Sequence, residues 1–128
     1  MKNFLENGFR EFQIDADEKQ LFQLTEYARL LKEWNEKMNL TAICDDEGIA
    51  AKHFLDSASA LLTGHVNGKV IDVGTGAGFP GLVLKIMKPE IDLTLLDSLN
   101  KRLTFLKAVS EEIGTAAQFI HARAEDGG

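Results

Sequence analysis

Apolar residues recur at helical spacing through the first half of the chain. A short amphipathic helix is predicted near the N-terminus, and a long one begins after Asp15 or Asp17 and ends near Met38. Polar and charged residues fill the intervening positions, so the long helix should bury one face. A third helix is predicted over about residues 45–63. This half shows no strand pattern and is therefore predicted to be helical.

From Lys69 onward the pattern changes to short apolar runs. Three runs are typical of buried strands: KVIDV (69–73), IDLTLLD (91–97) and AQFIHA (117–122). The segments between them, 79–88 and 99–113, are predicted to be helices. The resulting order, β-α-β-α-β with short connections, predicts right-handed crossovers and a parallel sheet.

The whole chain is therefore predicted to be an α/β protein in two portions. A helical portion, 1–66, precedes a sheet portion, 67–128. Three strands and two helices make up about half of an open doubly wound sheet, so we expect the sheet portion to be incomplete at its C-terminal end.

Composition narrows the class of protein. A chain of 128 residues suits one domain, and its 14 basic against 20 acidic residues give a net charge of −6. This charge argues against indiscriminate nucleic-acid binding but allows a local basic face. Cys44, the single cysteine, excludes an intrachain disulfide, and it shows no metal-ligand spacing with the three histidines. No apolar run approaches membrane-helix length and no signal core is present, so we expect a cytoplasmic protein with no membrane contact. We also expect no bound metal; the sequence leaves the oligomeric state open, and a monomer is the default expectation.

A glycine-rich loop follows the first predicted strand. It reads Asp72-x-Gly74-x-Gly76-x-Gly78 and leads into a helix. A tight turn can require glycine for its backbone freedom alone. Three alternating glycines between a strand and a helix instead favour close approach of a ligand, beyond the carboxyl ends of the strands.

Two ligand classes fit this loop. Residues 76–81 match the dinucleotide pattern G-x-G-x-x-G, with Asp97 at a suitable distance downstream. However, Asp72 puts a carboxylate where phosphates would lie, and Pro80 lacks one of the N–H groups that would bind them. S-adenosylmethionine has an ammonium, a sulfonium and no phosphate, and suits the loop better. In either interpretation Asp97 can accept hydrogen bonds from both ribose hydroxyls, or it can simply cap the next helix.

The end of the third strand offers further candidates. Glu125 and Asp126 would lie beside the adenine of such a ligand, or form a solvated loop pair.

Several segments together resemble one family. They are EWNEKMNLTAI (33–43), KHFLDS (52–57), DVGTGAGFPGLVLKI (72–86), LLDSLNKRLTFL (95–106) and HARAED (121–126). In this order they look like the bacterial 16S rRNA guanine-N7 methyltransferase family, once called glucose-inhibited division protein B. The combination of Asn-Leu-Thr, His-x-x-Asp-Ser and Gly-Phe-Pro-Gly is far more specific than the glycine loop alone.

The resemblance implies a fold, an activity and a set of cofactor contacts. The fold would be a Rossmann-like class I S-adenosylmethionine-dependent methyltransferase domain behind a helical N-terminal portion. The activity would be methyl transfer to N7 of a specific guanine, with 16S rRNA or the small ribosomal subunit as partner. Gly74, Phe79, Ala124 and Glu125 match positions that contact the cofactor. The family pattern continues beyond this chain with further strands, so the activity is an expectation for the full-length parent.

The acceptor base would need a pocket of its own. His53 and Asp56, three residues apart on a helix, share a face. They either seat the helical portion on the sheet or line the guanine pocket. Asn39, at the end of the long helix, is a third pocket candidate or part of a C-terminal turn. A general base is not required, because guanine N7 already has a lone pair.

Two other functions remain open at this point. The overlapping dinucleotide pattern allows a nicotinamide-dependent oxidoreductase, which would bind NAD. A truncated, non-catalytic binding module would bind the cofactor weakly or not at all.

Overall fold

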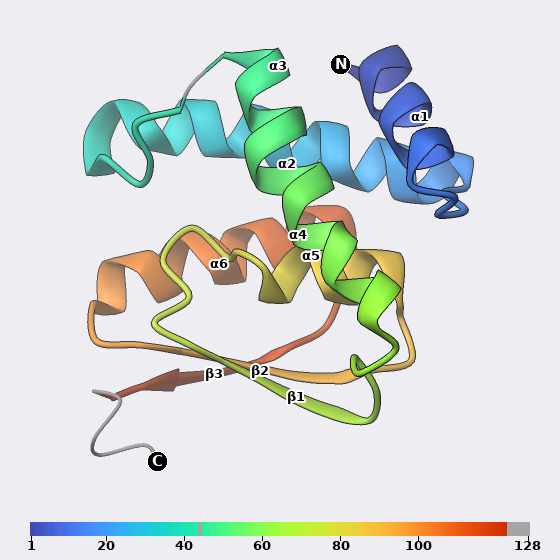
Figure 1. Cartoon of the computed structure of the whole chain (residues 1–128). Coiled ribbons are helices and arrows are strands. Elements are labelled where there is room, and N and C mark those ends of the chain that lie inside the picture. The colour runs from blue at the N-terminus through green and yellow to red at the C-terminus, as the bar shows by residue number, and fades with distance from the viewer. Residues whose placement is uncertain (44, 123–128) are drawn as a thin grey trace.

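The helical portion lies on top of the α/β portion in the computed structural model, which describes residues 1–43 and 45–122 (Figure 1). The first helix, α1 (Lys2–Glu11), precedes the long helix α2 (Glu18–Met38). Asp17 begins α2 with a capping box: its carboxylate accepts from the Gln20 N–H at 2.8 Å, and the Gln20 side chain accepts from the Asp17 N–H at 2.9 Å. Asp17, not Asp15, is therefore the cap.

The third helical segment is continuous but changes its winding. Asp45 caps it by accepting from the Gly48 N–H at 2.8 Å. Four pieces then follow without a break: α3 (Asp46–Gly48), the π-helical η1 (Ile49–Leu55), α4 (Asp56–Ala58) and the 3₁₀ segment η2 (Ser59–Thr63). The predicted extent is confirmed, whereas hydrophobic spacing gave no sign of the π-helical turns.

The α/β portion has the predicted order and a parallel sheet. Its strands are β1 (Lys69–Val73), β2 (Asp92–Asp97) and β3 (Gln118–His121), hydrogen-bonded in the order β1-β2-β3. Helices α5 (Gly81–Met87) and α6 (Asn100–Ile113) pack on one face of the sheet, and α2 packs on both of them (Figure 1). This arrangement is that of the first half of a Rossmann-like fold.

A single hydrophobic core joins the two portions. Its largest fully buried side chains come from both: Phe9, Tyr27, Phe54 and Phe105. Trp34 on α2 contacts Phe105 on α6, with ring centroids 5.6 Å apart. The division of the chain at residue 66 stays a prediction, because this shared core neither requires nor excludes it.

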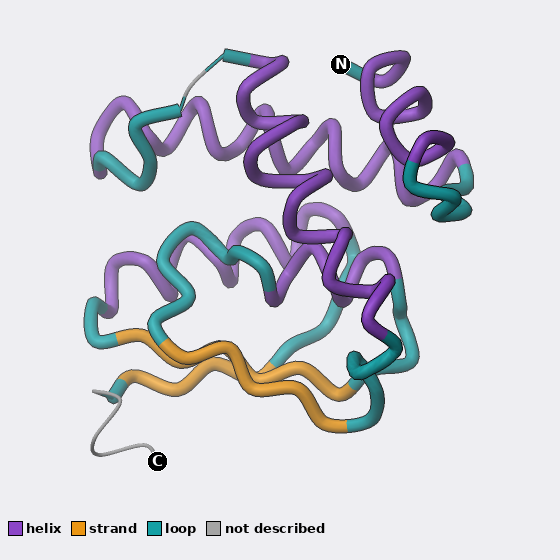
Figure 2. The backbone as a smooth tube through the Cα atoms, viewed as in Figure 1, coloured by secondary structure: helices purple, strands orange, loops and turns teal. Residues whose placement is uncertain are grey.

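The second face of the sheet is open. In the part of the chain that the structure describes, the helices all lie on the other side of the strands (Figure 2). Ile71, Val73 and Ile120 are therefore 65%, 52% and 44% exposed. Parallel sheets are usually covered on both faces, so this face resembles an interior surface. Of the helices described, none has both the length and the apolar character needed to cross a membrane.

Candidate functional site

The glycine loop forms an open cradle at the carboxyl end of β1. Gly74 and Gly76 have φ values of +67° and +59°. A Cβ built on either residue meets no other atom within 4 Å. A positive φ is costly for other residues, and the space over these two glycines lies open beyond the strand ends. This is the place where ligands bind in open α/β sheets.

Gly78 is required for a different reason. Its φ is +101°, and a Cβ there would overlap the hydroxyl oxygen of Tyr27 and lie 2.8 Å from Cδ2 of Leu106. The third glycine of the motif is thus packed against α2 and α6. It shapes the loop, whereas Gly74 and Gly76 form the open surface.

Most N–H groups of the loop already bond within the protein. The Gly74 N–H donates to the Leu96 carbonyl at 2.8 Å, and the Gly78 N–H donates to the Thr75 carbonyl at 2.9 Å. The Gly76 N–H donates to Asp97 Oδ2 at 2.8 Å. The loop is therefore held in shape by its own protein contacts and does not present a row of free amides to a phosphate.

Asp97 connects this loop to the next helix. It ends β2 with only 1% of its surface exposed. Besides the bond from Gly76 to Oδ2, its Oδ1 accepts from the Leu99 N–H at 2.8 Å, and the Arg102 guanidinium lies 3.5 Å from the same oxygen. The N-cap of α6 is Leu99, which has no side-chain capping bond, so Asp97 fixes the residue before the helix and does not itself cap α6. Oδ1 already has two partners, whereas Oδ2 has one and can accept another, so a ribose contact at Oδ2 is compatible with this arrangement.

Asp72 lies beneath the loop. Its Oδ2 accepts from the Gly81 N–H and from the Thr75 hydroxyl, both at 2.9 Å. Burial raises the pKa of Asp72, and this increase is opposed by these two hydrogen bonds. The carboxylate thus ties the loop to the start of α5, and its contact with a cofactor stays a prediction.

Phe79 connects the glycine loop to the helical portion through ring contacts. Its ring stacks on His53 of η1, with centroids 4.3 Å apart and planes at 6°, and on Tyr27 of α2 at 5.5 Å and 15°. The aromatic contact couples the predicted cofactor loop to the predicted pocket residue. Tyr27 was not singled out from the sequence, because its signal is a hydroxyl among otherwise apolar residues at helical spacing.

A cavity of about 400 Å³ adjoins Phe79. Its lining consists of Lys52, His53, Asp56, Ser57, Ala60, Phe79 and Pro80. The structure therefore brings His53 and Asp56 to one cavity. Asn39 is not part of the lining; it is exposed and ends α2 in a left-handed conformation, as the C-terminal-turn alternative predicted.

His53 is held by Thr41 and not by Asp56. Its Nε2 lies 2.9 Å from Thr41 Oγ1, and the Thr41 N–H donates to Asn35 Oδ1 at 2.8 Å. Burial lowers the pKa of His53, which favours a neutral ring with one donor and one acceptor nitrogen. The Thr41 contact was not anticipated, because the two residues belong to separate segments.

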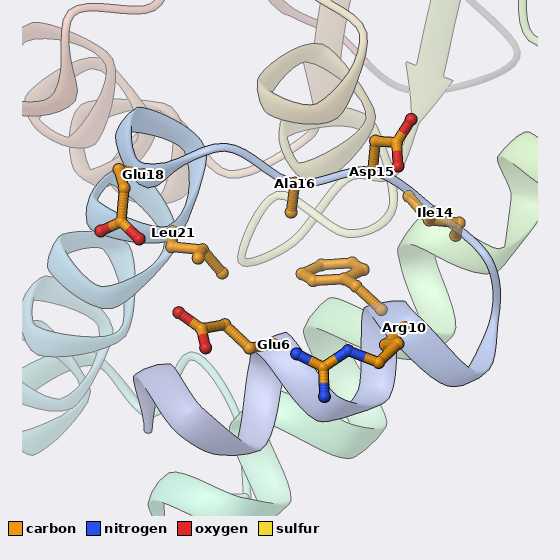
Figure 3. Close-up of a pocket in the computed structure, with 8 residues that line it drawn as sticks. Glu6, Arg10, Ile14, Asp15, Ala16, Glu18 and Leu21 are labelled. Atoms are coloured by element: carbon orange, nitrogen blue, oxygen red, sulfur yellow. The ribbon is translucent and has the colours of Figure 1, made fainter.

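A second hollow lies elsewhere, between α1 and the start of α2 (Figure 3). It measures about 270 Å³, and Glu6, Arg10, Asp15 and Glu18 contribute charges of both signs. It shares no residue with the glycine loop. Among the residues that the structure describes, no group of His, Cys, Asp and Glu could hold a metal ion. Four residues singled out from the sequence lie outside the described ranges: Cys44, Ala124, Glu125 and Asp126.

Comparisons with known proteins identify the family of the chain. The profile of the GidB family, described as rRNA small subunit methyltransferase G, matches residues 20–127. The chain belongs to this family. GidB relatives named ribosomal RNA small subunit methyltransferase G occur in Alkaliphilus metalliredigens, 52% identical over 99% of this chain, and Streptococcus thermophilus, 48% identical over 94%. A third, from Alkaliphilus oremlandii, is 49% identical over 98%. The chain spans about half the length of these GidB relatives, 54%, 53% and 54% respectively.

Proposed function

We propose that this chain forms the cofactor-binding half of an enzyme that transfers a methyl group from S-adenosylmethionine to N7 of a guanine in 16S rRNA. One observation carries the proposal: the open cradle over Gly74 and Gly76 lies next to the Asp97 carboxylate at the carboxyl edge of a parallel sheet. The names of its relatives support the methyltransferase class and an rRNA substrate.

The residues fit a nucleoside without phosphates. Gly74 and Gly76 leave space for it, Gly78 keeps the loop in shape, and Oδ2 of Asp97 accepts a hydrogen bond from a ribose hydroxyl. Asp72 and Phe79 flank the loop below and beside it. Ala124 and Glu125 complete the proposed set at the adenine. When bound, S-adenosylmethionine supplies a methyl group that is already activated by the sulfonium charge.

The cavity at His53 is proposed to receive the guanine. A neutral His53 can donate one hydrogen bond and accept another, and the exposed carboxylate of Asp56 can accept from the N–H groups of the base. Because N7 needs no deprotonation, these residues have to position the base, which can lower a barrier by several kcal/mol. The carboxylate would also stabilise the positive charge that guanine gains on methylation.

The proposed partners follow from this reaction. They are 16S rRNA or the small ribosomal subunit, met in the cytoplasm, with the protein as a monomer. Neither the structure nor the relatives favour the nicotinamide alternative or the non-catalytic one. The internally bonded loop amides and the Asp72 carboxylate count against a pyrophosphate ligand.

Calorimetric titration of the chain with S-adenosylmethionine, with NAD as control, tests the cofactor. Tritium transfer from labelled S-adenosylmethionine to unmodified small-subunit rRNA, catalysed by a longer protein that contains this sequence, tests the reaction. Asp92→Ala is the matched control for Asp97→Ala, since Asp92 is exposed at the opposite end of β2. Binding of NAD alone would refute the proposal, as would transfer that persists unchanged in Asp97→Ala.

A further inference from the structure

Tyr27 is a buried tyrosine in surroundings that would suit phenylalanine. It has no exposed surface, and its ring contacts Phe54, Phe79 and Phe105 at centroid distances of 5.3, 5.5 and 6.5 Å. The hydroxyl finds one partner there, the carbonyl oxygen of Ala77, to which it donates a hydrogen bond. Burial raises the pKa of Tyr27 well above its usual value, so the hydroxyl remains a donor at any physiological pH.

This hydrogen bond reaches the glycine loop from the helical portion. The other hydrogen bonds of residues 74–79, in the described part of the chain, stay within the α/β portion: they involve Asp72, Thr75, Leu96, Asp97 and Leu82. The contact falls between Gly76, which faces the open cradle, and Phe79, which contacts His53. It is also so close that a Cβ on Gly78 would overlap the hydroxyl oxygen.

We propose that the Tyr27 hydroxyl is a positioning group that holds the glycine loop in its ligand-accepting shape from outside the sheet. Without it the Ala77 carbonyl, in a residue that is 6% exposed, loses its partner. A buried carbonyl without a partner is costly, so the loop would turn toward water and open more often. The identity of the ligand rests on the proposed function, whereas the positioning of the glycine loop by Tyr27 does not.

Tyr27→Phe removes the hydroxyl and keeps the ring contacts. Thr25→Val is the matched control, because it removes from the same helix a hydroxyl that, among the described residues, bonds only to the Leu21 carbonyl of that helix. Amide hydrogen exchange, followed by mass spectrometry, measures loop opening without any ligand. Residues 74–79 of Tyr27→Phe are expected to exchange roughly five- to tenfold faster, the factor for one buried hydrogen bond, with β2 and α6 unchanged. Thr25→Val should leave the loop at the wild-type rate.

Titration with S-adenosylmethionine then links loop shape to binding. The dissociation constant is expected to rise by a similar factor in Tyr27→Phe and to stay constant in Thr25→Val. Unchanged loop exchange in Tyr27→Phe would overturn the proposal, as would uniform acceleration throughout the chain or faster loop exchange with unaltered affinity. A wild-type chain that binds no S-adenosylmethionine would count against the proposed function alone, because the exchange rates still decide the role of Tyr27.

Discussion

Two alanine substitutions in the glycine loop should separate packing from ligand binding. At Gly76 the φ of +59° strains an alanine by about 1–2 kcal/mol, and its Cβ meets nothing within 4 Å. At Gly78 the φ of +101° adds comparable strain, and the Cβ collides with Tyr27 and Leu106, an overlap that costs a further ~1–3 kcal/mol. We therefore expect Gly78→Ala to lower the free energy of unfolding by about 2–5 kcal/mol, and Gly76→Ala by only about 1–2 kcal/mol.

The effects of loop substitutions on affinity for S-adenosylmethionine should not follow their effects on stability. Gly76→Val fills the open space of the cradle and should abolish binding by molecules that remain folded. Urea unfolding gives the stabilities, and calorimetric titration of the folded fraction gives the affinities. Tyr27→Phe should partly rescue Gly78→Ala, because it removes the atom with which the Cβ overlaps. Equal loss of stability at positions 76 and 78 would refute the packing argument, and wild-type binding by Gly76→Val would refute the cradle as the ligand site.

Three further predictions concern the ionisable groups of the site. Asp97→Ala should weaken S-adenosylmethionine binding and lower the free energy of unfolding by about 1–3 kcal/mol, because the Gly76 and Leu99 amides lose their acceptor. The exposed Asp92→Ala should change neither quantity. Calorimetric titration and urea unfolding measure both, and equal effects of the two substitutions would contradict this role of Asp97. Asp72→Asn keeps an oxygen that accepts both internal hydrogen bonds, and it removes the cost of a buried charge, so the free energy of unfolding at pH 7 should stay the same or rise. If the affinity for S-adenosylmethionine also stays the same, Asp72 does not bind the cofactor. Because burial lowers the pKa of His53 below 6.5, its contribution to stability is complete above pH 6.5 and is lost as the pH falls toward the folded-state pKa. In urea unfolding, His53→Gln should therefore lose less stability than the wild type between pH 7.5 and 5.5. An identical pH dependence in the two proteins would contradict the lowered pKa of His53.

The elements of the fold could be predicted because their signals are local. The capping box at Asp17 and the apolar run of β2 each lie within a few consecutive residues. The order of strands and helices then leaves few topologies open. The π-helical winding of η1 could not be predicted, because it depends on how this segment packs on α1 and not on its own spacing.

The sequence predicted where the site lies but not what each of its residues does. Glycine spacing located the loop, yet only the structure separates Gly76, which faces open space, from Gly78, which is packed. The difference comes from Tyr27, whose hydroxyl meets the loop fifty residues further along the chain. His53 likewise depends on Thr41 across a turn. Such pairings arise only when distant segments meet in the folded core.

The shared core has a consequence for how the molecule loses its structure. Because α2 packs on both α5 and α6, helices and sheet should unfold in one cooperative transition. Trp34, the single tryptophan, contacts Phe105 across this boundary and reports the transition by its fluorescence. A ligand at the glycine loop, present at a hundred times its dissociation constant, would stabilise the whole unit by about 2.7 kcal/mol. Helical residues that do not contact the ligand therefore help to set the temperature at which the ligand site unfolds.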